Sequence, residues 1–109
     1  MVKPIPENLP SRLGKRGRVK MPPNGDVFTF IVDDEIKHMQ QNSGGKKLLV
    51  LQKIKFDEDG HTEIRFCYYI KGKKEGMKDR WVYGQFAPIA PVKDIQVILE
   101  EAKKKGWFS

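Results

Sequence analysis

The sequence has little of what secreted and membrane proteins require. Its single cysteine, Cys67, excludes an internal disulfide framework and a zinc site built on several thiolates. It has no apolar run of about 18 residues, the length of a membrane-spanning helix. The N-terminal residues are charged and lack the apolar segment of a secretory signal. We therefore expect a cytoplasmic protein that does not associate with membranes.

Residues suited to catalysis are also scarce. The two histidines, His38 and His61, are not spaced with Cys67 as metal ligands would be. The few serines show no nucleophile motif, and the chain has neither a GxxxxGK[ST] phosphate loop nor a dinucleotide-binding fingerprint. We therefore expect a protein that is not an enzyme and that binds no cofactor and no metal.

One acidic cluster is the exception to this scarcity. Asp33, Asp34 and Glu35, followed by Lys37, are suited to holding Mg²⁺ in a metal-dependent nuclease. Acidic residues in such a run also cap and stabilise the start of a helix. Capping is the simpler interpretation, and the nuclease is kept as a third hypothesis.

Positive charge is what the sequence has in excess. The 109 residues include 21 Lys and Arg against 14 Asp and Glu, which gives a net charge of +7. This excess favours an anionic partner such as nucleic acid, although many basic proteins bind none.

The charge is concentrated near the N-terminus. Residues 1–26 carry six basic and two acidic side chains, together with five of the seven prolines. This composition is too poor in apolar residues to fold alone. It predicts an extended basic arm over 1–26, centred on GKRGRVK at 14–20, before a single domain at 27–109. Such an arm either follows a phosphate backbone or only increases solubility.

The domain has the pattern of a mixed fold. The β-branched and aromatic run 27–32 predicts a strand, and Asp33 is placed to cap a short helix after it. The segments 47–56 and 61–71 predict a hairpin, and 80–86 predicts a further strand.

A C-terminal helix is predicted over 92–105. Ile95, Ile98, Leu99 and Ala102 have the spacing of one apolar stripe, and Gly106 suits the residue after the helix. The predicted fold class is α+β: an antiparallel sheet of about four strands, a short helix after the first strand and a C-terminal helix.

The hairpin turn sets the predicted strand register. If Gly60 takes the left-handed position of a three-residue turn, Asp57 opposes His61. Lys53 then lies directly beside Arg65, where like charges are unfavourable unless an anion covers them. This register predicts a basic sheet face, which includes Tyr69. An ordinary solvated face is the alternative.

Aromatic residues accompany these charges. Trp81 and Tyr83 alternate onto one face of the last predicted strand, and Trp107 and Phe108 follow the C-terminal helix. Exposed rings interleaved with Lys and Arg bind single-stranded nucleic acid, because bases stack on rings while the cations follow the phosphates. The same rings also suit a core or a dimer interface.

The layout resembles that of the ThermoDBP-related proteins of archaea. The resemblance is carried by GKRGRVKMPPNGDVFTF near the start and by RWVYGQFAPIAPVKDIQVILEEAKKKGWF at the end. It implies a single-stranded DNA-binding domain that self-associates, and it identifies no individual binding residue. High Lys and Glu content with one Cys agrees with a thermophilic source.

The leading prediction is a protein without catalytic activity that binds single-stranded DNA, or RNA, on one sheet face. The expected phosphate ligands are Lys15, Arg16, Arg18, Lys53, Arg65 and Arg80. The expected stacking residues are Tyr69, Trp81 and Tyr83. The second hypothesis is a structural or regulatory module that forms a homo-oligomer through the same aromatic residues.

Overall fold

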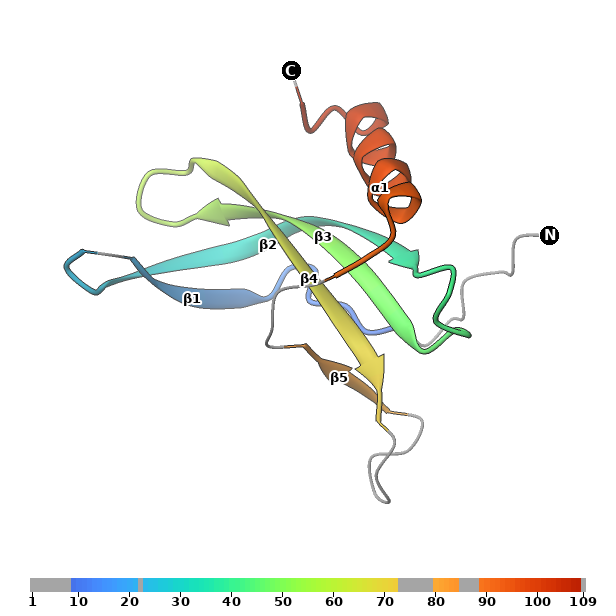
Figure 1. Cartoon of the computed structure of the whole chain (residues 1–109). Helices are drawn as coiled ribbons and strands as arrows, with labels where there is room; N and C mark the ends of the chain where they lie inside the picture. Colours follow the sequence, from blue (N-terminus) through green and yellow to red (C-terminus); the bar gives the residue numbers. More distant parts are fainter. Residues whose placement is uncertain (1–8, 22, 73–79, 85–88, 109) are drawn as a thin grey trace.

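The chain folds into one five-stranded antiparallel sheet and one helix (Figure 1). The computed structural model describes residues 9–21, 23–72, 80–84 and 89–108. Each strand pairs with the next along the chain, and the sheet curls into a half-barrel. The α+β class, the antiparallel sheet and the C-terminal helix are confirmed. The elements are β1 (Arg16–Met21), β2 (Asp26–Met39), β3 (Lys47–Phe56), β4 (Thr62–Lys71), β5 (Trp81–Tyr83) and α1 (Val92–Lys104).

The predicted count of four strands is wrong because β1 lies inside the predicted arm. β1 pairs with β2 from Arg16 opposite Ile31 to Met21 opposite Asp26. Val32 extends this pairing through backbone hydrogen bonds to residues 14 and 15. Backbone pairing with β2 therefore orders a segment whose own side chains bury little. The part of the arm at 1–8 lies outside the described residues.

The short helix predicted after the first strand is also wrong. β2 continues through that segment to Met39 and pairs with β3 from Phe30 to Met39. A register shift between Val32 and Asp34 makes Asp33 a bulge residue. The acidic residues that begin at Asp33 are typical of a helix N-terminus. The backbone hydrogen bonds to β3 outweigh this weak local preference.

The two faces of the sheet are packed differently. The helix face carries Ile36, Leu49 and Leu51, against which Ile98 and Ala102 of α1 pack. The inner face of the half-barrel carries two further buried clusters, which comprise Phe30, Val32, Ile54 and Phe56, and Leu48, Val50, Cys67 and Tyr69. β3 is therefore buried on both sides, which explains why its sequence does not alternate between apolar and polar residues.

Helix α1 follows Pro91 and ends before Gly106, whose φ of 77° is left-handed. Its predicted apolar stripe is only partly buried: Ile98 is 2% exposed, whereas Leu99 is 44% exposed. A polar residue, Asp94, takes a buried place on this stripe and accepts a 2.6 Å contact from His38 Nε2. In the described ranges, no helix is long and apolar enough to cross a membrane.

The hairpin register differs by one residue from the prediction. Gly60 is left-handed as expected, with φ 75°, but the turn contains four residues, and Phe56 pairs with His61 through its N–H. Arg65 therefore lies opposite Gln52, and Lys53 lies opposite Ile64. Because a one-residue slip exchanges the faces of a strand, Lys53 is on the helix face and Arg65 is on the inner face.

Candidate nucleic-acid interface

The inner face brings together most of the residues predicted on the folded sheet. Tyr69 and Tyr83 are directly opposed on β4 and β5, and Trp81 lies opposite Lys71. Arg65 shares this side of β4 because it alternates with Cys67 and Tyr69. Lys53 does not belong to this group, so the predicted Lys53–Arg65 pair is wrong.

The side chain of Arg65 is held in place from two directions. Its Nε and Nη2 groups both donate to Gln52 Oε1, at 2.9 and 2.7 Å. Its guanidinium carbon lies 5.0 Å from the centre of the Phe30 ring, a cation–π arrangement. Gln52 is itself fully buried and donates to Glu35 Oε2 at 2.9 Å. The packed sheet thus fixes the direction in which this positive charge points.

Arg65 opens onto a pocket of about 230 Å³ between the two edges of the half-barrel. Arg18 and Gly17 contribute from β1, Tyr83 from β5, and Arg12 from the segment before β1. Among the described residues, no carboxylate lies within ion-pairing distance of any of these three arginines. The pocket is therefore a concentration of unneutralised positive charge.

Arg12 is the pocket residue that sequence reasoning missed as a ligand. Its backbone N–H donates to Glu35 Oε2 at 3.3 Å, and the neighbouring Ser11 hydroxyl donates to Glu35 Oε1 at 2.6 Å. These contacts attach the segment before β1 to the inner face of β2. The only signal in the sequence was its membership of the basic N-terminal group, which says nothing of this attachment.

The three predicted stacking rings differ in accessibility. Tyr69 is 5% exposed, and burial raises its pKa to about 12. Tyr83 is 38% exposed and packs edge-on against Tyr69, with 5.4 Å between ring centres. Trp81 is half-buried beneath the Lys71 ammonium group. Tyr69 therefore supports Tyr83, and only Tyr83 and part of Trp81 are open to a base.

Burial also raises the pKa of Tyr83, while the nearby charges of Arg65 and Arg12 act in the opposite direction. The Tyr83 ring thus lies in the field of two of the three pocket arginines. It is both a flat apolar surface and a neighbour of positive charge, as stacking beside a phosphate requires.

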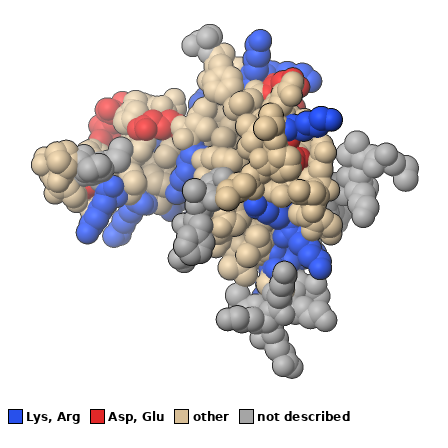
Figure 2. Space-filling view, viewed as in Figure 1, with Lys and Arg blue, Asp and Glu red and all other residues tan. Residues whose placement is uncertain are grey.

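The other predicted phosphate ligands lie outside the pocket. Lys15 and Arg80 are exposed, and Arg16 is exposed but is paired with Asp57. Figure 2 shows basic side chains beneath β1, whereas acidic side chains gather near the β3–β4 turn. The charge that the sequence concentrates near its start thus follows one edge of the folded sheet.

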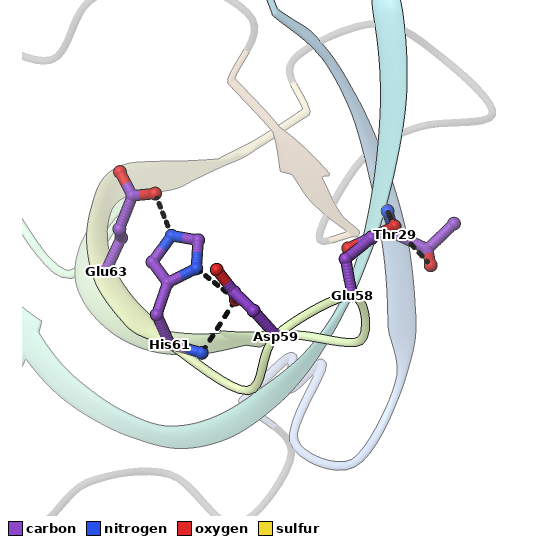
Figure 3. Close-up of polar contacts among 5 residues, drawn as sticks. All are labelled: Thr29, Glu58, Asp59, His61 and Glu63. Atoms are coloured by element: carbon purple, nitrogen blue, oxygen red, sulfur yellow. Dashed lines mark hydrogen bonds and ion pairs between the residues drawn. The ribbon is translucent and has the colours of Figure 1, made fainter.

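The acidic β3–β4 turn has its own polar network (Figure 3). His61 contacts Asp59 through Nδ1 and Glu63 through Nε2, and these contacts raise its pKa. Glu58 accepts a 3.1 Å hydrogen bond from the N–H of Thr29 on β2. These contacts stabilise the hairpin end and place negative charge away from the arginine pocket.

The predicted nuclease cluster is not assembled. Asp34 lies on the helix face and accepts hydrogen bonds from Lys105 and Trp107, each at 3.1 Å. Glu35 points to the inner face, and Asp33 is the exposed bulge residue. Within the described ranges, no three carboxylate, histidine or cysteine groups are placed to hold a metal ion.

A second exposed surface lies on the outer side of α1. A groove of about 460 Å³ is lined mainly by apolar residues there, including Val92, Leu99 and Phe108, which are 83, 44 and 45% exposed. Glu100 and Lys103 line the same groove. This surface is separate from the arginine pocket, because α1 packs on the opposite face of the sheet.

No protein-family model, curated protein or solved structure matches this chain.

Proposed function

We propose that this protein binds single-stranded nucleic acid, with DNA as the first candidate, across the opening of the half-barrel between β1 and β5. The observation that carries the proposal is the pocket lined by Arg12, Arg18 and Arg65, none of which is ion-paired with a carboxylate among the described residues. Uncompensated guanidinium groups bind phosphate through charge-assisted hydrogen bonds.

Tyr83 makes the pocket more suitable for a nucleotide strand than for a simple anion. It lines the pocket, is 38% exposed and is supported from behind by Tyr69. Stacking of one base on such a ring contributes about 1–3 kcal/mol. Trp81, next but one along the same strand, offers a second and less open ring. Lys15, which lies between Arg12 and Arg18 in the sequence, and Arg80, which precedes Trp81, are both exposed. They supply further positive charge outside the pocket.

The direct test is the anisotropy of fluorescent oligo-dT, titrated with the protein at several salt concentrations. Binding should weaken steeply with salt, because each neutralised phosphate releases counterions. Arg12→Ala should weaken binding and lower the log–log salt slope by about 0.7. Tyr83→Ala should raise Kd about tenfold with little change in slope, since it removes stacking rather than charge.

Lys93→Ala is the matched control, because Lys93 is an exposed cation on α1, across the sheet from the pocket. It changes the net charge as Arg12→Ala does and should leave affinity nearly unchanged. A loss equal to that of Arg12→Ala would show that binding follows net charge and not the pocket. Absence of oligo-dT binding at low salt would refute the proposal, and oligo-U measured in parallel compares RNA with DNA.

A second candidate function, self-association, is favoured by the apolar groove on α1. Its rim carries opposite charges at Glu100 and Lys103. An antiparallel copy of the same helix would set Glu100 of each chain against Lys103 of the other, as a two-fold interface requires. Light scattering should then give a mass above the 12.6 kDa of one chain, and Leu99→Glu should reduce it to the monomer.

A further inference from the structure

The arginine pocket is more rigid than a site that only follows a phosphate backbone needs to be. Arg65 uses Nε and Nη2 on Gln52, which leaves its Nη1 group without a hydrogen-bond partner among the described residues. The Phe30 ring supports the guanidinium plane. Because this side chain is already ordered, little rotamer entropy is lost when Nη1 meets a ligand.

The Glu35 carboxylate lies beside the pocket but forms no ion pair with its arginines. The two oxygens of Glu35 accept hydrogen bonds from the Ser11 hydroxyl, the Arg12 N–H and the Gln52 amide. Glu35 thus reaches Arg65 only through Gln52, and it forms no ion pair with it. Three arginine residues line a single pocket of about 230 Å³, and the charges of Arg65 and Arg12 act on its Tyr83 ring.

β1 closes over this pocket because Gly17 has no side chain. A Cβ atom on Gly17 would lie 2.5 Å from Phe30 Cζ, so only glycine lets the edge strand rest on that ring. The ring that supports Arg65 is thereby also the one on which β1 lies. Arg18, the next residue of β1, also lines the pocket, although strand alternation turns its side chain to the opposite side from Gly17.

We propose that this pocket binds the terminal phosphate monoester of a nucleic-acid strand, with Tyr83 stacking on the terminal base. The inference rests on the proposed function and assigns one place on the strand to this pocket. A phosphodiester inside a strand carries one negative charge, whereas a phosphate monoester carries about −1.5 to −2 at neutral pH and offers three acceptor oxygens. Two arginine charges beside the Tyr83 ring, those of Arg65 and Arg12, with a third arginine on the pocket lining, match the second ligand better than the first.

The test compares two decathymidylates labelled at the 3′ end, one with a 5′-phosphate and one with a 5′-hydroxyl, at fixed moderate salt. We expect the phosphorylated strand to bind about tenfold more tightly. Arg12→Ala should reduce this ratio towards one, because Arg12 is exposed and its backbone contact to Glu35 is kept in the alanine variant. Lys93→Ala should keep the full ratio.

Arg65→Lys adds a second, independent variant. It keeps the positive charge but loses the fork that holds Gln52, so the preference for the 5′-phosphate should fall more than binding of the 5′-hydroxyl strand. Circular dichroism of each variant establishes that the sheet is retained before the ratios are compared.

The outcomes separate this inference from the proposed function. Equal, measurable binding of both strands overturns the terminal-phosphate assignment and leaves single-strand binding standing. Absence of binding to either strand overturns the proposed function itself. Competition by thymidine 5′-monophosphate as strong as that by the phosphorylated strand overturns the strand-end assignment in favour of a free mononucleotide. A third decathymidylate, labelled at the 5′ end and phosphorylated at the 3′ end, tests the other terminus: if it binds more tightly than the 5′-phosphorylated strand, the 5′ assignment is overturned.

Discussion

Gly17→Ala tests the close approach on which the geometry of the pocket depends. The added Cβ would lie 2.5 Å from Cζ and 2.8 Å from Cε2 of Phe30. Carbon atoms pack at about 3.5–4 Å, so β1 and the ring must separate by about 1 Å. Phe30 is 1% exposed and packs against Phe56, with ring centres 5.9 Å apart, so the ring has little room to retreat.

The expected cost follows from two opposing contributions. Overpacking of this kind destabilises by about 1–3 kcal/mol. Replacing glycine by alanine in a strand stabilises the folded state by about 0.5–1 kcal/mol, because the unfolded chain loses conformational entropy. We therefore expect a net loss of about 1–2 kcal/mol in the free energy of unfolding, measured by urea denaturation followed through tryptophan fluorescence.

Lys20→Ala on the same strand is the control, because Lys20 is exposed and its removal creates no clash. It should change stability by less than about 0.5 kcal/mol. A Phe30→Leu background removes the ring atoms that the new Cβ meets, so Gly17→Ala should cost less there. If Gly17→Ala is as stable as Lys20→Ala, or if its cost is the same in the Phe30→Leu background, the close approach is not what shapes this edge.

Three further measurements test the packing around the site. Tyr69→Phe should leave stability unchanged or slightly increased, because the buried hydroxyl has no hydrogen-bond partner among the described residues; urea denaturation measures this. Cys67 should react slowly with a thiol reagent in the native state and quickly in urea, since it is 3% exposed and burial raises its pKa. His61 should titrate by NMR with a pKa above 6.5, and Asp59→Asn should lower its midpoint. Because the folded pKa is raised, the charged ring stabilises the fold fully below about pH 6.5, and this contribution is lost as pH rises through the folded pKa.

The C-terminal helix was predictable because its signals are local. Pro91 before it and Gly106 after it agree with the observed bounds, which differ from the prediction by one residue. The hairpin was predictable for the same reason, since Gly60 does take the left-handed conformation. Its register was not, because a three-residue and a four-residue turn use glycine alike and only the packing of both sheet faces chooses between them.

The segments that the sequence mispredicted are those that depend on backbone pairing with a neighbouring strand. β1 has few apolar side chains, and the second half of β2 begins with residues that also cap helices. Both segments are strands because their backbones hydrogen-bond to a neighbouring strand, β1 to β2 and the second half of β2 to β3. Hydrogen bonding to a partner strand leaves no local signature in the residues that accept it, so composition alone could not identify these strands.

The sequence by itself determined the class of fold, the positions of its most local elements and the excess of positive charge that favours an anionic partner. Only the tertiary structure decided which charges meet. It separated Lys53 from Arg65 by a one-residue slip, and it brought Arg12 to Arg65 across the inner face. The physical reason is that net charge is a sum over the chain, whereas a binding site depends on strand register and sheet curvature, which long-range packing sets.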